Sequence, residues 1–375
     1  MTSPAAASSD ATVQEITATP FRLTYASAVV LSDGVRETAD QILVTVTTSD
    51  GVTGYGECIP RPGIYGETLE TAVSIIEHYI APRTLGTRIT DIQLLAKKLG
   101  ALKGNPSARS SVEVAVVDAL ARTLGVPAHR LLGGYADTVP CSAILAYAAP
   151  DAVVAEARSL RNADGVRIFK LKVGGDPARD GATAYALRTE LGDDAVIYAD
   201  ANGRYTCQEA AQFLRLGLDA QLFGLEEPIS GDALGGRRLL AQDPSALIIG
   251  DETCADPRAV IAEISAGRCT AVSVKPARTG IIASSRIREY CGALGAPLII
   301  GTQADSAIGA YVAAAFAASS AFTATAPAEV LFHRAFEQNP VCELPKVSEG
   351  LMHLPECPGF GYEIDPSVMK ECMIR

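Results

Sequence analysis

A polar residue or a glycine follows each of several short apolar segments, at a nearly constant interval, in the second half of the chain. One strand, one helix and two short loops need about this interval, because parallel strands require a crossover helix between them. Eight such units close a barrel, so the spacing predicts a parallel β/α barrel, with an open doubly wound sheet as the alternative. The intervals are 28, 26, 25, 24 and 26 residues, between Lys172, Asp200, Glu226, Asp251, Lys275 and Gly301.

The expected barrel strands are apolar segments separated by helical patterns. A Gly-x-Gly-x-x-Gly sequence, typical of dinucleotide-binding open sheets, follows none of them, which favours the barrel. The expected strands are 140–146, 167–173, 195–201, 221–225, 247–250, 271–275, 297–301 and 322–326, the last with the weakest pattern.

The first third of the chain has a different organisation. Residues 41–55 alternate apolar and polar side chains around an Asp-Gly hairpin turn, and helical patterns follow at 68–79 and 108–124. An antiparallel sheet followed by helices is an α+β block. The length of 375 residues therefore fits a barrel of about 250 residues plus a smaller companion domain.

Composition narrows the class of protein further. The net charge is 32 − 43 = −11, which argues against an electrostatic nucleic-acid binder. The nine cysteines form no Cys-x-x-Cys pair, which favours buried thiols in a reducing cytoplasm over disulfides or a zinc site.

The longest charge-free run, 306–328, is mostly Ala, Ser, Thr and Gly, so we expect a buried helix and a strand there rather than a membrane span. The small, polar start of the chain lacks the pattern of a signal peptide and predicts a disordered tail.

Three acidic residues lie at the ends of successive expected strands: Asp200, Glu226 and Asp251. A single Asp after a strand is most simply a helix N-cap, but three successive strand ends converge on one rim of a barrel, where active sites lie. Three carboxylates without a counter-charge repel one another and raise each other's pKa. An oxygen-binding dication resolves the repulsion, so the pattern predicts Mg²⁺; zinc is disfavoured because no His or Cys joins the set.

Lysines stand on both sides of these carboxylates. Lys170 and Lys172 are two residues apart on one strand and point to the same side, and Lys275 follows a strand further round the barrel. The simplest explanation is salt bridges to the carboxylates. The functional interpretation makes Lys172 a base, with Lys170 as a supporting charge and Lys275 facing the other side of the substrate. Two such lysines can remove a proton α to a carboxylate and return one elsewhere. The four histidines lie outside the strand ends, so lysine carries the protons.

The residues at the expected strand ends lie in five short motifs, at 169–174, 198–203, 225–228, 250–252 and 274–280. Together these motifs resemble the enolase superfamily, and more narrowly the muconate lactonizing enzyme subgroup of the mandelate racemase/muconate lactonizing enzyme family. Further segments resemble the family's capping-domain signature (54–57), the start of its barrel (131–134) and the C-terminal segment that returns to the cap (358–362).

The resemblance implies an α/β fold: a modified (β/α)7β TIM-type barrel with an N-terminal α+β capping domain. The domains expected from it are a disordered tail at 1–12, the cap at 13–135, the barrel at 136–335 and the returning C-terminal segment at 336–375. It also implies a homo-oligomer that acts on a small-molecule carboxylate. Charge and composition predict a cytoplasmic protein without nucleic-acid or membrane partners.

The resemblance also implies roles for the residues that match. Enolase-superfamily sites use a Lys or His base with Mg²⁺ on an enediolate. Here Asp200, Glu226 and Asp251 match the ligands of Mg²⁺, which Mn²⁺ is able to replace. Lys172 and Lys275 match the acid/base pair, and Lys170 the assisting lysine. The mandelate racemase subgroup carries a His-Asp dyad in place of the lysine at position 275, so it is excluded.

The sequence motifs indicate the identity of the substrate less closely than they indicate the type of reaction. Gln303-x-Asp305 resembles one lineage of muconate cycloisomerases, and the Asp-x-Asp of dipeptide epimerases is missing from 323–329. Arg61 is either a ligand for a distal carboxylate or a solvated surface residue. Asn202, Glu252 and Tyr65 are further candidates for contacting the substrate or supporting the site.

The sequence therefore predicts a lactonising muconate-type cycloisomerase. The alternatives are a racemase or epimerase of N-acyl amino acids or dipeptides, and a dehydratase of the o-succinylbenzoate synthase type. A barrel that binds an acid without catalysis is disfavoured, because it would be expected to have lost part of the set of carboxylates and lysines.

Overall fold

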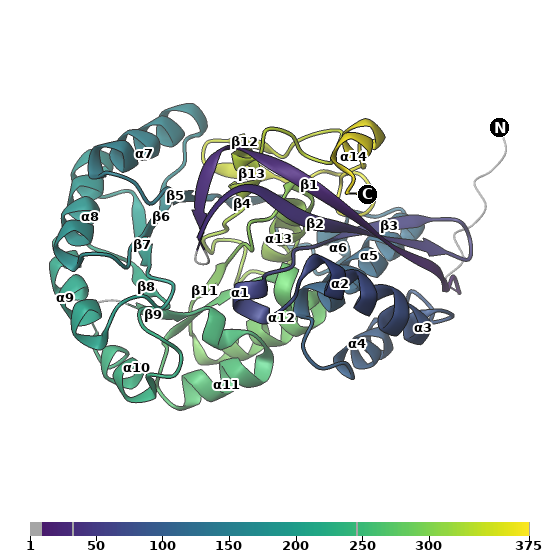
Figure 1. Cartoon of the computed structure of the whole chain (residues 1–375), viewed down its shortest axis with the longest axis horizontal. Coiled ribbons are helices and arrows are strands. Elements are labelled where there is room, and N and C mark those ends of the chain that lie inside the picture. The colour runs from purple at the N-terminus through teal and green to yellow at the C-terminus, as the bar shows by residue number, and fades with distance from the viewer. Residues whose placement is uncertain (1–9, 32–33, 245–246, 375) are drawn as a thin grey trace.

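The computed structural model describes residues 10–31, 34–244 and 247–374, arranged as a cap over a barrel (Figure 1). Most of the expected disordered tail, residues 1–9, lies outside the described residues. Ala11, however, is buried, and Thr12 forms a bridge with Arg88, so ordered structure begins before residue 13.

The cap contains a three-stranded antiparallel sheet in the order β1 (Val13–Leu31), β2 (Gly34–Thr48) and β3 (Thr53–Cys58). Gly54 and Gly56 let α5 lie directly on β3, since a Cβ on either glycine would come within 2.2 Å of a backbone oxygen of α5. The cap helices are α1 (Pro62–Tyr65), α2 (Leu69–Ile75), a π-helical turn (Ile76–Ile80), α3 (Ala81–Thr84), α4 (Ile92–Gly100), α5 (Pro106–Leu124) and α6 (Ala128–Leu131).

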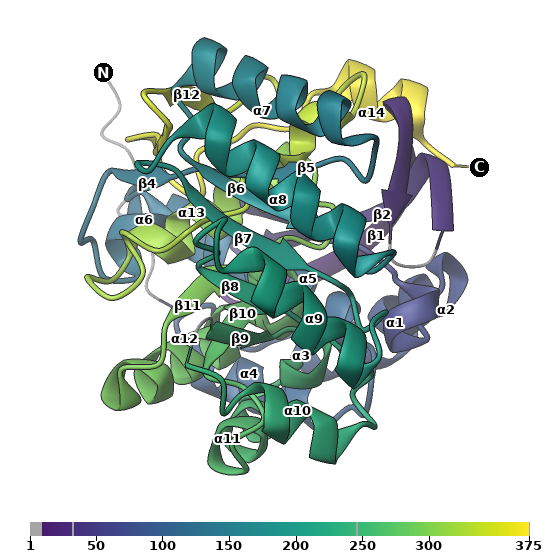
Figure 2. The ribbon, with the colours of Figure 1, turned by 90° about the vertical axis from the view of Figure 1, so that its left-hand side faces the viewer.

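Seven parallel strands form the curved wall of the barrel, each paired with the next along the chain, and helices cover its outer side (Figure 2). The strands are β5 (Ser142–Leu145), β6 (Ile168–Lys172), β7 (Val196–Asp200), β8 (Gly224–Glu226), β9 (Leu247–Gly250), β10 (Ala271–Val274) and β11 (Leu298–Ile300). The helices are α7 (Pro150–Asp164), α8 (Pro177–Leu191), α9 (Cys207–Gly217), α10 (Leu234–Leu240), α11 (Pro257–Ser265), α12 (Pro276–Leu294) and α13 (Ala307–Ala318), with a 3-10 turn at Glu252–Cys254.

The eighth position of the wall differs from the sequence prediction. Residues 322–325 form turns and residue 326 a bend, so the strand expected there, within the charge-free run, is wrong. Ala328 instead forms parallel bridges with both Ile300 and Cys141, at the two edges of the seven-stranded sheet. The neighbouring residues add hydrogen bonds at this closure: Pro327 O accepts one from Ile300 N, and Glu329 N donates one to Ile300 O, at 2.8 Å each.

The barrel is followed by a C-terminal segment that reaches back to the cap. After a 3-10 turn (Phe332–Ala335), this segment contains β12 (Lys346–Ser348), β13 (Leu351–His353) and α14 (Pro366–Cys372). β13 pairs with β12 and with β4 (Thr138–Pro140), and Met373 forms a bridge with Phe21 of β1. The C-terminal segment thus contacts both the cap and the start of the barrel.

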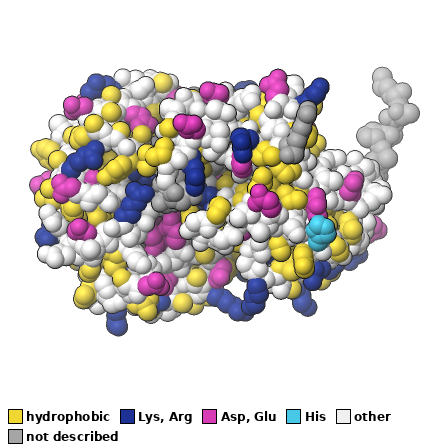
Figure 3. Space-filling model, viewed as in Figure 1, with side chains coloured by type: hydrophobic (Ala, Val, Ile, Leu, Met, Phe, Trp, Pro, Cys, Tyr) yellow, Lys and Arg dark blue, Asp and Glu magenta, His cyan; other side chains and the backbone are white. Residues whose placement is uncertain are grey.

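Two further features concern the charged surface and the longest charge-free run of the chain. On the face in Figure 3, acidic and basic side chains are interspersed and do not form a large patch of one sign. No helix among the described residues is both long and apolar enough to cross a membrane, and α13, within the charge-free run, is buried along its whole length.

Candidate active site

β6 carries two lysines on the inner side of the barrel. Lys170 is only 2% exposed, and its Nζ lies 2.9 Å from Glu226 Oε1 and 3.0 Å from Asp200 Oδ2. Lys172 lies nearer the rim, where 21% of its side chain is exposed, and its Nζ donates to Asp200 Oδ2 at 2.7 Å. The two lysines are therefore distinct in environment: one is enclosed by carboxylates, and the other is accessible.

Asp200 and Glu226 end two neighbouring strands that pair at these two residues. Burial opposes the ionisation of Asp200, but Lys170 and Lys172 outweigh it and hold the pKa of this carboxyl below its ordinary value. Burial raises the pKa of Glu226 well above its ordinary value, although Lys170 opposes the shift. Glu226 Oε2 is buried and makes no hydrogen bond. This oxygen therefore remains available to a further positively charged partner.

Asp251 follows β9 and is held by two cations from the next β/α unit. Lys275 Nζ donates to Asp251 Oδ2 at 2.5 Å, and Arg278 Nη1 donates to Asp251 Oδ1 at 2.9 Å. Burial opposes the charged form of Lys275, but Asp251 raises the pKa of this amine above its ordinary value. No role was predicted for Arg278 from the sequence, although this residue lies within segment 274–280, which carries the family resemblance.

Asn202 and Glu252 extend the polar side of the site. Asn202 Oδ1 accepts a hydrogen bond from Lys172 Nζ at 2.9 Å, and its Nδ2 donates to Glu252 Oε1 at 3.1 Å. The backbone of Asn202 has φ of 43°, a left-handed conformation that Asn tolerates better than most residues. This turn lets Asn202 N donate to Asp200 Oδ1 at 2.9 Å, which fixes the carboxylate.

Glu329 also belongs to this cluster, although no role was predicted for it from the sequence. Its Oε1 accepts hydrogen bonds from Lys170 Nζ at 2.9 Å and from the Tyr198 hydroxyl at 2.8 Å, and its Oε2 accepts one from Thr302 N at 3.0 Å. The expected strand at 322–326 ended too early to place Glu329 at a strand end. The available signal was its position as the first charged residue after the 306–328 run.

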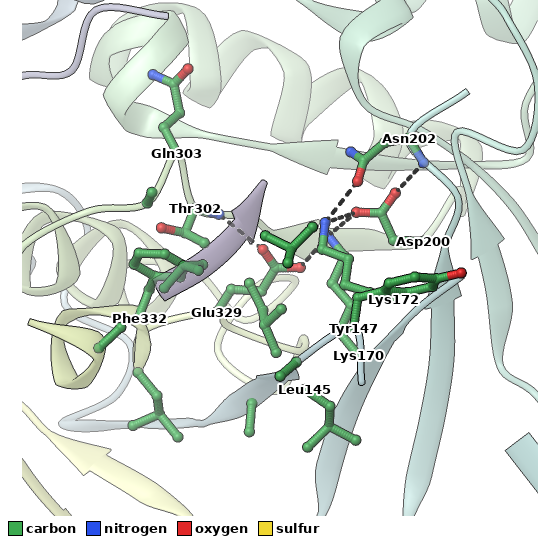
Figure 4. Close-up of a pocket in the computed structure, with 18 of the residues that line it drawn as sticks. Leu145, Tyr147, Lys170, Lys172, Asp200, Asn202, Thr302, Gln303, Glu329 and Phe332 are labelled. Carbon is green, nitrogen blue, oxygen red and sulfur yellow. Dashed lines mark hydrogen bonds and ion pairs between the residues drawn. The ribbon is translucent and has the colours of Figure 1, made fainter. Parts of the chain in front are cut away.

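One cavity of about 540 Å³, to which the barrel and the cap both contribute, is lined by most of these side chains: Lys170, Lys172, Asp200, Asn202, Glu252, Lys275 and Glu329. Glu226, Asp251 and Arg278 are not among the described residues that line it. In Figure 4 the charged groups gather around Asp200, while Leu145 and Phe332 line the opposite, apolar side. The cavity volume is in the range of pockets that hold small organic molecules. The cap contributes residues 27–30, Arg61, Ile64 and Tyr65.

The predicted substrate-contacting residues are divided between the cavity and its surroundings. Arg61 lines the cavity, and its Nη1 donates to Gln303 O at 3.2 Å. Gln303 also lines it, but in Figure 4 its amide points away from the lysines. Tyr65 lines the cavity with its hydroxyl 3.4 Å from Arg278 Nη1. Asp305 is buried and is not among the described residues that line the cavity; its Oδ1 accepts a hydrogen bond from Gln303 N at 3.1 Å.

A capped parallel barrel that presents carboxylates and lysines from successive strand ends to one cavity has the architecture of an enolase-superfamily enzyme. A family model described as enolase C-terminal domain-like matches residues 152–368. A second, described as the N-terminal domain of mandelate racemase and muconate lactonizing enzyme, matches residues 14–133. The chain therefore belongs to the mandelate racemase/muconate lactonizing enzyme family of the enolase superfamily, as the sequence motifs predicted.

Individual relatives are similar over most of the chain. A crystal structure of muconate lactonizing enzyme from Mycobacterium smegmatis, complexed with muconolactone, is 32% identical and superimposes with a TM-score of 0.95, covering 97% of this chain and all of that one. Muconate cycloisomerase 1 of Pseudomonas putida is 30% identical over 338 residues, 88% of this chain and 89% of its own. L-Ala-D/L-Glu epimerase of Bacillus subtilis is 29% identical over 288 residues, 75% of this chain and 78% of its own. These relatives are isomerases, and the chain is an enzyme of that class.

Proposed function

We propose that this protein is a Mg²⁺-dependent cycloisomerase that interconverts an unsaturated dicarboxylate of the muconate type and its lactone. The observation that carries the proposal is the placement of Lys172 and Lys275 on one cavity, with β7, β8 and β9 between their strands in the sheet. Similarity to muconate lactonizing enzymes along almost the whole chain, including the cap, supports this reaction over others of the family.

The donor set suits a hard dication. Asp200, Glu226 and Asp251 would hold Mg²⁺, because all three offer carboxylate oxygens from adjacent strand ends. The buried Glu226 Oε2, which has no hydrogen-bond partner, is a ligand atom without another role in the described structure. When bound, Mg²⁺ would supply positive charge that binds the substrate carboxylate and stabilises the negative charge that develops on its oxygens.

Lys172 is the group that would move the proton. It is the more exposed lysine of β6, and its amine stands at the cavity rim, held by Asp200 and Asn202. In lactonisation, a distal carboxylate oxygen of the substrate forms a C–O bond while Lys172 gives a proton to the carbon α to the other carboxylate. In the reverse direction the neutral amine removes that proton as the C–O bond breaks. Lys275 would add positive charge from the opposite wall.

The reaction can be tested by incubating the Mg²⁺-loaded protein with cis,cis-muconate in deuterated water. We expect a lactone that carries deuterium at one carbon α to a carboxylate, detected by NMR and absent when Lys172 is replaced by Ala. Absence of lactone, in a preparation that catalyses deuterium exchange on another carboxylate, would reject muconate-type substrates while leaving the proton-transfer chemistry in place.

An epimerase or racemase of dipeptides or N-acyl amino acids is the second candidate. Lys275 lines the same cavity as Lys172, and two amines on opposite sides of one carbon are what inversion requires. Incubation with L-Ala-L-Glu and with N-succinylamino acids in deuterated water distinguishes the two reactions. Deuterium at the α-carbon with inversion, and no lactone from muconate, would favour this candidate.

A further inference from the structure

We propose that His129, Asp137 and Glu356 form a second metal site, for a divalent transition ion such as Zn²⁺, Co²⁺ or Ni²⁺. One ligand atom from each residue lies within 4.8 Å of the other two. The residues come from three parts of the fold: α6 at the end of the cap, the residue before β4, and the segment after β13. None of the three is among the described residues that line the active-site cavity.

His129 provides the observation that points to a ligand. The residue is 2% exposed, and its Nε2 is buried without a hydrogen bond. This nitrogen lies 3.5 Å from Asp137 Oδ1. That separation is long for a hydrogen bond, but it is close to the roughly 3.4 Å between two ligand atoms that each bind one zinc ion at its usual distance and tetrahedral angle. A bound ion would satisfy a buried nitrogen that is otherwise costly to desolvate.

Backbone hydrogen bonds hold the three segments together. Leu354 N donates to Asp137 O at 2.9 Å, which ties the C-terminal segment to the start of the barrel. Ala128 N donates to Gly359 O at 2.6 Å, which ties α6 to the same segment. Because the ligands come from segments already fixed relative to one another, little conformational entropy is lost when they converge on an ion.

Arg130 is the competitor for this site. Its Nη2 lies 2.7 Å from Asp137 Oδ1 and 3.4 Å from Glu356 Oε1. These ion pairs are exposed to water: 42% of the Arg130 side chain, 56% of Asp137 and 69% of Glu356 are accessible. Exposed pairs of this kind contribute little, so the guanidinium can move to solvent when an ion with two positive charges binds. Removal of Arg130 should therefore strengthen metal binding.

The ligand set separates this site from the proposed Mg²⁺ site. Imidazole nitrogen favours Zn²⁺, Co²⁺ and Ni²⁺, whereas Mg²⁺ prefers oxygen ligands throughout. An excess of Mg²⁺ should therefore occupy Asp200, Glu226 and Asp251 without displacing a transition ion from His129. The proposed site joins the cap, the barrel and the C-terminal segment, so its occupancy should raise the thermal stability of the whole chain.

The test is binding of Co²⁺, followed by its visible absorption, and of Zn²⁺, followed by equilibrium dialysis, with Mg²⁺ in excess. The parent is the full chain with Cys357→Ser, because this exposed thiol next to Glu356 could itself bind metal. We expect one ion per chain, affinity at least tenfold weaker in His129→Gln and Glu356→Gln, and tighter binding in Arg130→Ala. Zn²⁺ should raise the Tm of the parent and leave that of His129→Gln unchanged.

Two results would overturn the proposal: affinity unaffected by His129→Gln and Glu356→Gln, or no binding to the Arg130→Ala variant. Glu356 is exposed, so its variant keeps the test valid even if replacement of the buried His129 prevents folding. Circular dichroism of the metal-free variants checks that the fold is retained.

Discussion

Lys170 and Glu329 form a salt bridge inside the barrel, in which Lys170 Nζ donates a hydrogen bond to Glu329 Oε1 at 2.9 Å. The same amine also contacts Asp200 and Glu226, so three buried carboxylates surround one buried lysine. Burial opposes its charged form, but the carboxylates outweigh burial and raise the pKa of Lys170 well above its ordinary value. Lys170 is therefore a cation near neutral pH, which supports the proposal that Lys172 is the proton carrier of β6.

Replacement of Lys170 by Met should destabilise the Mg²⁺-free protein by about 3–5 kcal/mol, because it leaves buried carboxylates without their shared cation. Urea unfolding measures the change. Addition of Mg²⁺ should recover part of the loss, since the dication would supply the missing charge. Lys346→Met on the exposed face of β12 is the control and should change the free energy of unfolding by less than about 0.5 kcal/mol. An equal effect of both substitutions would contradict the role of Lys170.

Replacement of Lys172 by Ala should lower turnover by about 10²–10⁴-fold, the usual contribution of a positioned acid or base. Lys172→Arg should be no better, because a guanidinium keeps its proton. Steady-state kinetics with the accepted substrate, together with loss of deuterium exchange at the α-carbon, measure the effect. Retention of exchange in Lys172→Ala would move the proton-transfer role to another residue.

Replacement of Glu226 by Gln tests the metal assignment independently of the substrate. The variant keeps the shape of the side chain and an acceptor for Lys170, but its amide cannot ionise to a carboxylate when a metal ion approaches the unpartnered Oε2 position. We expect Mg²⁺ affinity to fall at least tenfold, a loss of about 1.4 kcal/mol or more, as measured by calorimetric titration of EDTA-treated protein. EDTA treatment alone should abolish activity until Mg²⁺ or Mn²⁺ is restored. Full activity after EDTA treatment would contradict the assignment.

The rim of the barrel was predictable because its residues are fixed by local periodicity. Each strand and its crossover helix have nearly constant lengths. They therefore place Asp200, Glu226 and Asp251 at the same edge of the parallel sheet, independently of contacts made elsewhere in the chain. Glu329 escaped prediction for the converse reason: Ala328 completes the wall through two bridges and no regular strand marks the position.

Arg278 illustrates a second limit. Its side chain reaches Asp251 from the first turn of α12, which is interrupted at Gly280 with φ of 75°. The contact depends on how α12 leaves the barrel, and α12 lies against α5 of the cap. Hydrophobic periodicity predicts neither the interruption nor the contact, because it indicates which side of a helix or strand is buried and not how that element is oriented in the fold.

The contact of α5 with β3 provides a stability test. Replacement of Gly56 by Ala would place a Cβ 2.1 Å from Ser111 O, so either the strand or the helix must shift. We expect destabilisation by about 1–3 kcal/mol, the usual cost of overpacking, measured by urea unfolding. Gly235→Ala in α10 is the matched control, because its Cβ would meet no atom within 4 Å. That variant should be neutral or more stable by up to about 1 kcal/mol, since Ala restricts the unfolded chain.

The junction of cap and barrel should make stability depend on pH. Glu57 of β3 is buried and accepts hydrogen bonds from Ser306 N and Gly309 N at the start of α13, at 3.2 Å each. Burial, and then the nearby Asp305, raise the pKa of Glu57 to about 8. In the unfolded chain this carboxyl ionises near its ordinary pKa of about 4.3. The folded protein therefore holds a proton that the unfolded chain has lost, and stability falls as pH rises through this range.

Glu57→Gln keeps an acceptor atom for the two N–H groups and removes the ionisation. The free energy of unfolding of both proteins can be measured in urea at about pH 5, 7 and 9. The two values should be similar at about pH 5. Between about pH 5 and 9 the parent should lose on the order of a few kcal/mol more than the variant. Glu113, which accepts a hydrogen bond from Ile282 N and whose pKa burial raises to about 7, adds its own dependence. Glu113→Gln therefore serves as a comparison, because it removes only the contribution of Glu113 to the pH dependence of stability. Identical pH profiles for the parent and Glu57→Gln would show that Glu57 is ionised in the folded protein.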